Sequence, residues 1–441
     1  MGKEKIEYQE EELQRASTLL EEGRHEKCLE VLRAYWLQHS RSAETVELIS
    51  RLMKEADQSE LAACLEQISE ARKGKESSEL DLEKVAEKVF EAGYKFIDLR
   101  EFEIAEMLLK VAGSCAPDDP TVHYELGFAM MSQAKYELAA RHFELVRKIE
   151  EDFDTVLNLS ACYSLSREFK KSKEMIKHLE KLAGSDEEKY ELQHRKYVLK
   201  RQEQLRKKNN MTRRDWLYIL YGSMLLYDPD EEQEDKAERG TESYKKIAST
   251  LMVLKGVLEG LRLAPEAVEF YGTNSRPLAA IIARLFDLPL SGYQGPDRPD
   301  HALMLIEWAP EIIGPHKSFV PNDKNRSVFS YGLPTAMPLP LIPDIVGHFE
   351  DKIILPWKGE SSATLQEEDT ETDPEEVIPE ILERAFNLES DPDILKIVHE
   401  SISYYVDKRE FLVLHNNKNF PHRPEYSAEV PGHFRRKVED D

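Results

Sequence analysis

Small residues recur in pairs along roughly the first 180 residues of the chain, and each pair is twelve positions apart. Successive pairs begin 34 and 33 residues after one another. The pairs are Gly93 with Ala105, Gly127 with Ala139 and, more weakly, Ser160 with Ser172. Small residues allow two antiparallel helices to cross closely, with larger apolar side chains beside the crossing. This period predicts helical hairpins that stack side by side.

The copy around Gly93 is the clearest. We expect a helix over residues 82–98, a turn at Arg100-Glu101, and a second helix that ends before Pro117. Proline lacks an N–H group and disfavours the helical conformation of the residue before it, so it ends the unit. Two weaker copies precede this one, with Ala16, Leu19, Cys28, Leu32 and Tyr35 in the first and Ser50, Met53 and Ala62 in the second.

The pattern resembles the tetratricopeptide repeat, although Glu66 departs from it in the second copy. Tryptophan is also missing from the first-helix position, where Glu12, Val46, Val89, His123 and Val156 stand. The resemblance implies a superhelix whose first helices line a concave face that holds a partner segment. An irregular helical bundle is the alternative.

The resemblance also implies which side chains line the concave groove. These are Phe90, Tyr94, Ile97, Tyr124, Phe128, Met131 and Asn158. Most of them are apolar or aromatic, which favours an extended or helical apolar partner segment over a clamp for a terminal carboxylate. The alternative is that the same aromatic residues pack against the carboxyl-terminal domain of this chain.

The composition changes beyond residue 185, and we expect a multidomain protein. The expected parts are helical repeats over 1–185, a basic capping helix over 186–214, a smaller α/β domain over 215–358, an acidic linker over 359–378 and a helical segment with a tail over 379–441. A polar helix is suited to closing the open end of a helical stack. Its cations offer a second interpretation, contact with nucleic acid or an acidic partner.

The α/β domain is predicted from alternating helix and strand patterns, which are typical of an open sheet. Trp216–Tyr221 reads as a strand or a short buried helix. The expected helices are Tyr244–Leu261 and Leu278–Phe286, and the expected strands are Ala267–Tyr271, His301–Trp308 and Lys352–Trp357.

Residues 271–290 resemble one segment of the type I phosphoribosyltransferase fold, in which a strand runs into a pyrophosphate loop and a helix. The acidic pair and Thr/Gly-rich phosphate loop of that family are missing, which implies that transferase activity is lost. Thr273, Asn274, Ser275 and Arg276 are still candidates for binding an anion at the start of the helix. The alternative is a helix capped by Ser275 or Asn274, with Arg276 in solvent.

Charge and motif content narrow the classes of function. With 60 basic and 85 acidic residues, the 441-residue chain has a net charge of −25, which disfavours affinity for nucleic acid. No apolar run approaches the ~18–20 residues that cross a bilayer, and the amino terminus has no signal-peptide pattern. The four cysteines form no C-x-x-C pair, as expected of free thiols in the cytoplasm. No catalytic, metal-binding or cofactor motif is present.

These observations predict a cytoplasmic scaffold that binds a protein partner through the concave face of its repeats, without catalysis, cofactor or membrane contact. The sequence carries no signal of the oligomeric state. The alternative is a sensor of phosphate or nucleotide, or a residual enzyme, that uses the Gly272–Pro277 loop.

Overall fold

The computed structural model divides the chain into two compact units, residues 1–183 and residues 184–441. The structure describes residues 14–24, 27–28, 31–32, 43–55, 58–73, 82–227, 243–293, 301–311, 326–334, 342–349, 353–357 and 374–413.

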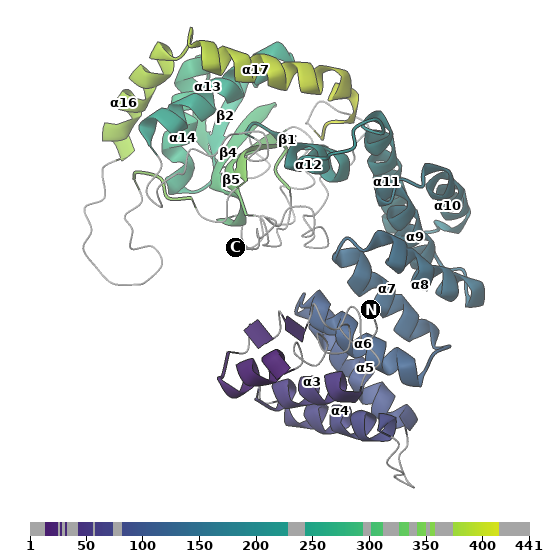
Figure 1. The fold of residues 1–441 in the computed structure, drawn as a ribbon. Coiled ribbons are helices and arrows are strands. Elements are labelled where there is room, and N and C mark those ends of the chain that lie inside the picture. The colour runs from purple at the N-terminus through teal and green to yellow at the C-terminus, as the bar shows by residue number, and fades with distance from the viewer. Residues whose placement is uncertain are drawn as a thin grey trace. The chain divides into compact units, whose positions relative to one another are not determined.

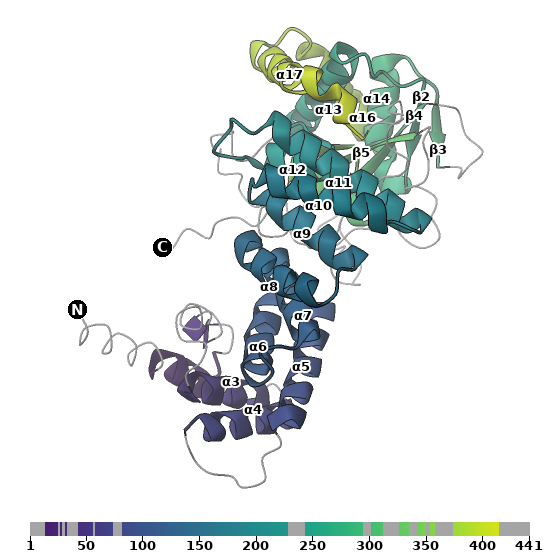
Figure 2. The ribbon, with the colours of Figure 1, turned by 90° about the vertical axis from the view of Figure 1, so that its right-hand side faces the viewer.

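The first unit is a series of antiparallel helix pairs in which each pair packs on the next (Figures 1 and 2). The helices are α3 (Ala43–Glu55), α4 (Ser59–Arg72), α5 (Leu82–Asp98), α6 (Phe102–Cys115), α7 (Pro120–Ser132), α8 (Tyr136–Ile149), α9 (Phe153–Leu165) and α10 (Phe169–Leu182). An earlier pair is described only in part, over residues 14–21, 27–28 and 31–32.

All five hairpin turns close with the same backbone hydrogen bond, 2.7–2.9 Å long. The amide after each turn donates to the carbonyl five residues earlier, as in a Schellman motif. The acceptor carbonyls belong to Leu19, Met53, Phe96, Met130 and Tyr163, which lie 34, 43, 34 and 33 residues apart. The predicted helical repeat is therefore confirmed, with nine additional residues between the second and third hairpins.

The residue that reverses the chain in these turns has a left-handed backbone. Gly23, Arg100, Ala134 and Arg167 have φ between +60° and +70°. Glycine adopts this conformation at no steric cost, whereas a residue with a Cβ does so at a cost of about 1 kcal/mol or more. Three of the four turns are therefore strained by their own sequence.

The small residues of the repeat lie at the helix crossings. A Cβ added to Gly127 would stand 3.0 Å from the Phe143 ring, which fills the space beside it. In the third pair both small residues are serine, and the Ser172 hydroxyl donates to the Ser160 carbonyl across the crossing at 2.9 Å. The periodic small residues thus follow from the close approach of paired helices.

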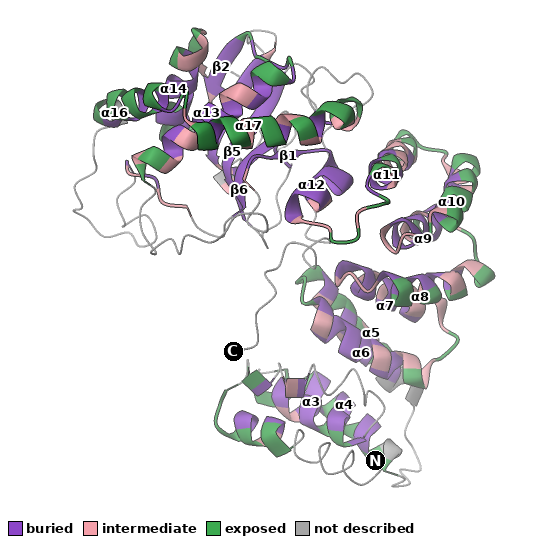
Figure 3. Cartoon of the chain, turned by 45° about the horizontal axis from the view of Figure 1, so that its top comes forward, coloured by how far each residue is buried: buried purple, intermediate pink, exposed green. Residues whose placement is uncertain are grey.

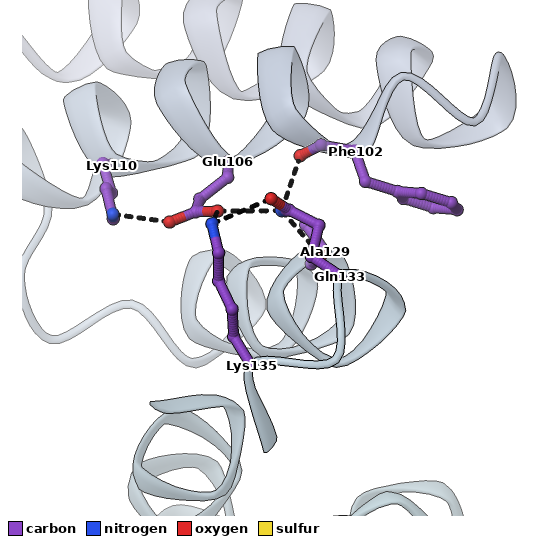
Figure 4. A network of polar contacts seen from close by, with 6 residues as sticks. All are labelled: Phe102, Glu106, Lys110, Ala129, Gln133 and Lys135. Carbon is purple, nitrogen blue, oxygen red and sulfur yellow. Dashed lines mark hydrogen bonds and ion pairs between the residues drawn. The ribbon is translucent and has the colours of Figure 1, made fainter. Parts of the chain in front are cut away.

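A buried carboxylate links the third hairpin to the fourth (Figure 4). Glu106 of α6 receives the ammonium groups of Lys110 at 2.5 Å and Lys135 at 2.6 Å, while Gln133 donates to it at 2.8 Å. Burial opposes the charge of Glu106, but the two lysines outweigh this effect and lower its pKa. Gln133 also donates to the Phe102 carbonyl at 3.1 Å, so one turn is fastened to the preceding hairpin.

The second unit contains a six-stranded parallel sheet in the order β1-β6-β5-β4-β2-β3. Its strands are β1 (Met224–Leu225), β2 (Ala267–Phe270), β3 (Leu290–Gly292), β4 (Ala302–Trp308), β5 (Arg326–Leu333) and β6 (Ile345–Phe349). The helices near it are α11 (Asp186–Gln204), α12 (Arg213–Tyr221), α13 (Tyr244–Gly260), α14 (Arg276–Phe286), α16 (Pro374–Asn387) and α17 (Pro392–Tyr405), with 3-10 turns η1 (Thr273–Ser275), η2 (Ala309–Glu311) and η4 (Val406–Phe411). A helical amino-terminal region followed by an open parallel sheet matches the predicted fold class.

Two of the three strands expected in this unit are present, and one is not. The strands expected at 267–271 and 301–308 are present as β2 and β4, and Trp216–Tyr221 lies in helix α12, which is almost wholly buried (Figure 3). The strand expected at Lys352–Trp357 is wrong, since the described residues 353–357 lie outside the sheet. The Trp357 indole instead donates to the Asn274 carbonyl at 3.0 Å.

The second unit extends beyond the predicted α/β domain at both ends. The polar helix α11, expected to cap the repeats, lies within residues 184–441, and its Arg201 side chain is fully buried. The Arg201 guanidinium donates to the carbonyls of Phe411 at 2.9 Å and Ile219 at 3.3 Å. Burial lowers the pKa of Arg201 to about 9. Residues 359–373 of the expected acidic linker lie outside the described residues, whereas residues 374–378 form the start of α16. The expected tail, from residue 414 on, also lies outside the described residues.

The carboxyl-terminal helices pack directly on α13 (Figure 1). A Cβ added to Gly256 would stand 2.8 Å from the Val398 side chain of α17, and one added to Gly260 would stand 2.2 Å from Ile402. At the end of α17, the Tyr405 hydroxyl accepts from the amide of Leu225 in β1 at 2.8 Å. These contacts make α17 a covering layer of the sheet unit.

Candidate protein-binding face

The first helices of the third to fifth hairpins carry the predicted groove residues. Tyr94 of α5 is 46% exposed, while Phe90 of α5 and Phe128 of α7 are half-buried. Tyr124 and Asn158 are half-buried as well, and they meet because the Asn158 amide donates to the Tyr124 hydroxyl at 3.2 Å. The structure therefore joins residues from α7 and α9 that the sequence analysis assigned to one face.

Two of the predicted groove residues are not available at the surface. Ile97 and Met131 are only 9% and 7% exposed. The three-to-four-residue spacing that placed them beside Tyr94 and Phe128 also describes the side of a helix that faces its neighbours. We therefore assign these two residues to packing within the repeats.

The aromatic rings are held in place by neighbours from the second helices. Phe128 meets Phe102 edge to face, with ring centres 6.3 Å apart. Tyr124 meets Phe143 in the same way at 5.6 Å. Such edge-to-face pairs fix the orientation of both rings.

Carboxylates lie near Tyr124, one of these aromatic residues. Burial and the nearby Asp98 carboxylate raise the pKa of Glu125 to about 7. Burial together with Asp154 and Glu125 raises the pKa of the Tyr124 hydroxyl. Asp98, Glu125 and Asp154 come from α5, α7 and α9, so three successive hairpins contribute negative charge to one region, which we call the acidic–aromatic face.

The sequence analysis did not identify these acidic residues as a group. A local signal existed, because Glu125 directly follows the aromatic Tyr124 and Asp98 directly follows Ile97. Acidic residues are so frequent in this chain, however, that neighbours in sequence alone do not distinguish a cluster from an ordinary solvated surface.

The second predicted site, Thr273–Arg276, lies between the carboxyl end of β2 and the start of α14. In open parallel sheets, ligands bind at such ends, where the strand order reverses. Thr273, Asn274 and Arg276 are exposed, but Ser275 is fully buried and its hydroxyl accepts from the Glu307 amide at 2.8 Å. Ser275 neither caps α14 nor presents its hydroxyl to the surface; it fastens the loop to β4.

Neither a metal-binding cluster nor a membrane-spanning helix is found among the described residues. Among them, no group of three or more His, Cys, Asp or Glu side chains is arranged to hold a metal ion. Nor does any described helix combine the length and apolar character needed to span a bilayer.

No family model and no curated protein matches the chain. Among solved structures, it is similar to one described as a functional characterisation of Pseudomonas aeruginosa pilF, with 16% identity over 46% of this chain and 87% of that one, at a TM-score of 0.24. It is also similar to MamA AMB-1, with 14% identity over 42% of this chain and 97% of that one, at a TM-score of 0.22. At scores this low, neither likeness defines the fold or function of this chain.

Proposed function

We propose that this protein is an interaction scaffold whose helical repeats hold a segment of a protein partner on the acidic–aromatic face. The observation that carries this proposal is the 46% exposed Tyr94 ring, which stands on the same helix face as the half-buried rings of Phe90 and, one repeat later, Phe128. Oriented aromatic rings provide contact area at little cost in conformational entropy, which is why they dominate binding surfaces.

The charges of the face indicate what the partner carries. Burial, and after it repulsion between Asp98 and Glu125, favours protonation of Glu125 near neutral pH. A lysine or arginine placed between them would relieve this repulsion, and the aromatic rings would bind its aliphatic stem or an adjacent apolar side chain. The partner segment is therefore basic and apolar, in extended or helical form.

The test uses the full-length protein and two labelled peptides of equal length, one of leucine and lysine and one of leucine and glutamate. We expect the basic peptide to bind and the acidic peptide not to bind. Raising the salt concentration should weaken binding, because exposed charges are screened. Tyr94→Ala together with Phe128→Ala should reduce affinity at least about tenfold, or about 1.4 kcal/mol.

Leu138→Ala is the matched control, since Leu138 is 42% exposed on the second helix of its hairpin. Circular dichroism confirms that each variant is folded before binding is compared. Equal binding of both peptides, or unchanged affinity in the folded double variant, would contradict the proposal.

A further inference from the structure

A cavity of about 590 Å³ lies between the second and third hairpins of the first unit. Its floor is apolar and is formed by Leu52, Met53, Leu61, Cys64, Phe96 and Ile104. An apolar cavity of about 150 Å³ already accommodates benzene, so this one has room for a considerably larger apolar body. It also falls within the volume range of ordinary ligand pockets.

The cavity follows from differences between equivalent positions of the repeats. We call the junction between the second and third hairpins, which holds the cavity, the open junction, and the one between the third and fourth hairpins the closed junction. Each position of the third hairpin recurs 34 residues later in the fourth, so the residues of the fourth hairpin show which side chains occupy the equivalent space at the closed junction. The equivalent pairs are Ala92 and Leu126, Lys88 and Val122, and Leu99 and Gln133.

At the closed junction, Leu126 and Val122 are each 4% exposed, and Gln133 reaches back to the preceding hairpin. At the open junction, the short side chain of Ala92 lines the cavity, and Leu99 is 68% exposed at its edge. The junction between the second and third hairpins thus differs in its side chains from the junction between the third and fourth.

Four charged residues form the rim. The Lys88 ammonium lies 3.0 Å from the Glu60 carboxylate, and the charge of Glu91 also acts on Lys88. Lys95 attracts Glu60 electrostatically, but it makes no ion pair with any residue that the structure describes. One cation at the edge of the apolar floor therefore remains open to an anionic group.

We propose that this cavity binds an apolar molecule with a single carboxylate, in the manner of a medium-chain acyl acid. The acyl chain lies on the floor between the hairpins, and the carboxylate pairs with Lys95. This site is separate from the acidic–aromatic face, because Lys88, Ala92 and Lys95 occupy a different stripe of α5 from Phe90 and Tyr94. It does not depend on the proposed scaffold function.

The probes are decanoate and decanol, which share an apolar chain and differ in charge, titrated calorimetrically into the full-length protein. We expect decanoate to bind up to about fivefold more tightly than decanol, because an exposed ion pair contributes up to about 1 kcal/mol. Lys95→Gln should remove this preference, whereas Lys177→Gln, a change at an exposed lysine of α10, should preserve it.

Ala92→Leu restores the residue found at the closed junction and should weaken the binding of both probes about tenfold or more. The same substitution should raise the melting temperature, because it fills a void. Ala92→Met is the second variant if leucine cannot be accommodated, since methionine adapts to irregular space. Decanoate bound equally well by a folded, filled variant would overturn the proposal, as would equal affinity for decanoate and decanol or no binding of either.

Discussion

The ionisation of Glu125 on the acidic–aromatic face should make the free energy of unfolding depend on pH. Its pKa is raised from 4.5 to about 7, chiefly by burial and then by Asp98. The folded protein therefore holds the proton more tightly than the unfolded chain does. The resulting stability is fully present below pH 4.5 and is lost as the pH rises through about 7.

One pKa unit corresponds to about 1.36 kcal/mol, so the shift from 4.5 to about 7 sets an upper limit of about 3.4 kcal/mol for the cost of ionising Glu125 in the folded state. Glu125 is only half-buried, and solvent screening reduces this figure to about 1–2 kcal/mol. Glu125→Gln should therefore stabilise α7 by about 1–2 kcal/mol near pH 8 and by little near pH 4.5.

Hydrogen exchange of peptides from α7, in the full-length protein, measures the free energy of opening at both pH values. Glu174→Gln, a change at an exposed residue within α10, is the matched control and should have little effect at either pH. An equal gain for Glu125→Gln at both pH values, or none at either, would refute the reasoning about repulsion. The same substitution should also weaken binding of the basic peptide, because it removes one carboxylate from the face.

Three further predictions concern the repeats. Ala134→Gly should raise the free energy of unfolding, measured in urea, by up to about 1 kcal/mol. Glycine relieves the strain of the left-handed backbone at φ 60°, although it also increases the entropy of the unfolded chain. A lower free energy of unfolding would contradict this prediction. Glu106→Ala should lower it by about 3 kcal/mol, because two lysines lose their buried counter-charge, and an effect below about 1 kcal/mol would show that the network contributes little. Burial, with His123 beside it, lowers the pKa of His142 to about 4, so its stabilising effect is present above pH 6.5 and is lost as the pH falls through about 4. His142→Gln should therefore remove about 2 kcal/mol of the stability loss between about pH 8 and about pH 5, as measured by urea unfolding at each pH.

The repeats could be predicted from sequence because their main constraint is local. Every crossing needs a small residue, and the partner helix lies only twelve positions away, so Gly127 and Ala139 are visible as a pair. The accessibility of Ile97 and Met131 could not be predicted in the same way. It depends on how adjacent hairpins pack, and helical spacing alone does not distinguish a groove from an interface.

The sheet was harder to predict because its buried polar residues find their hydrogen-bond partners far away in the sequence. Strand β5 includes the buried Arg326, an unusual residue for a central strand, and its guanidinium donates to the Glu269 carboxylate of β2 at 2.8 Å. These partners are 57 residues apart. Without knowledge of that pairing, a charged residue and two serines do not indicate a buried strand, and residues 326–333 are not among the strands expected from the sequence.

The acidic–aromatic face was predicted only in part. Its rings follow from the repeat period, whereas its charge depends on Asp98, Glu125 and Asp154 from three separate helices. Nothing in the spacing of these acidic residues shows that they face the same volume. Their mutual influence becomes visible only when the helices are placed.

The glycines of α13 have a practical consequence for handling this protein. Val398 and Ile402 of α17 pack against Gly256 and Gly260 of α13. Tyr405, at the end of α17, is hydrogen-bonded to β1. If the chain were cut or truncated within residues 359–373, α17 would be lost. The apolar surface of α13 at Gly256 and Gly260 would then be exposed to solvent. Preparations shortened there should aggregate, and a fused reporter is better attached after residue 413 than before residue 374.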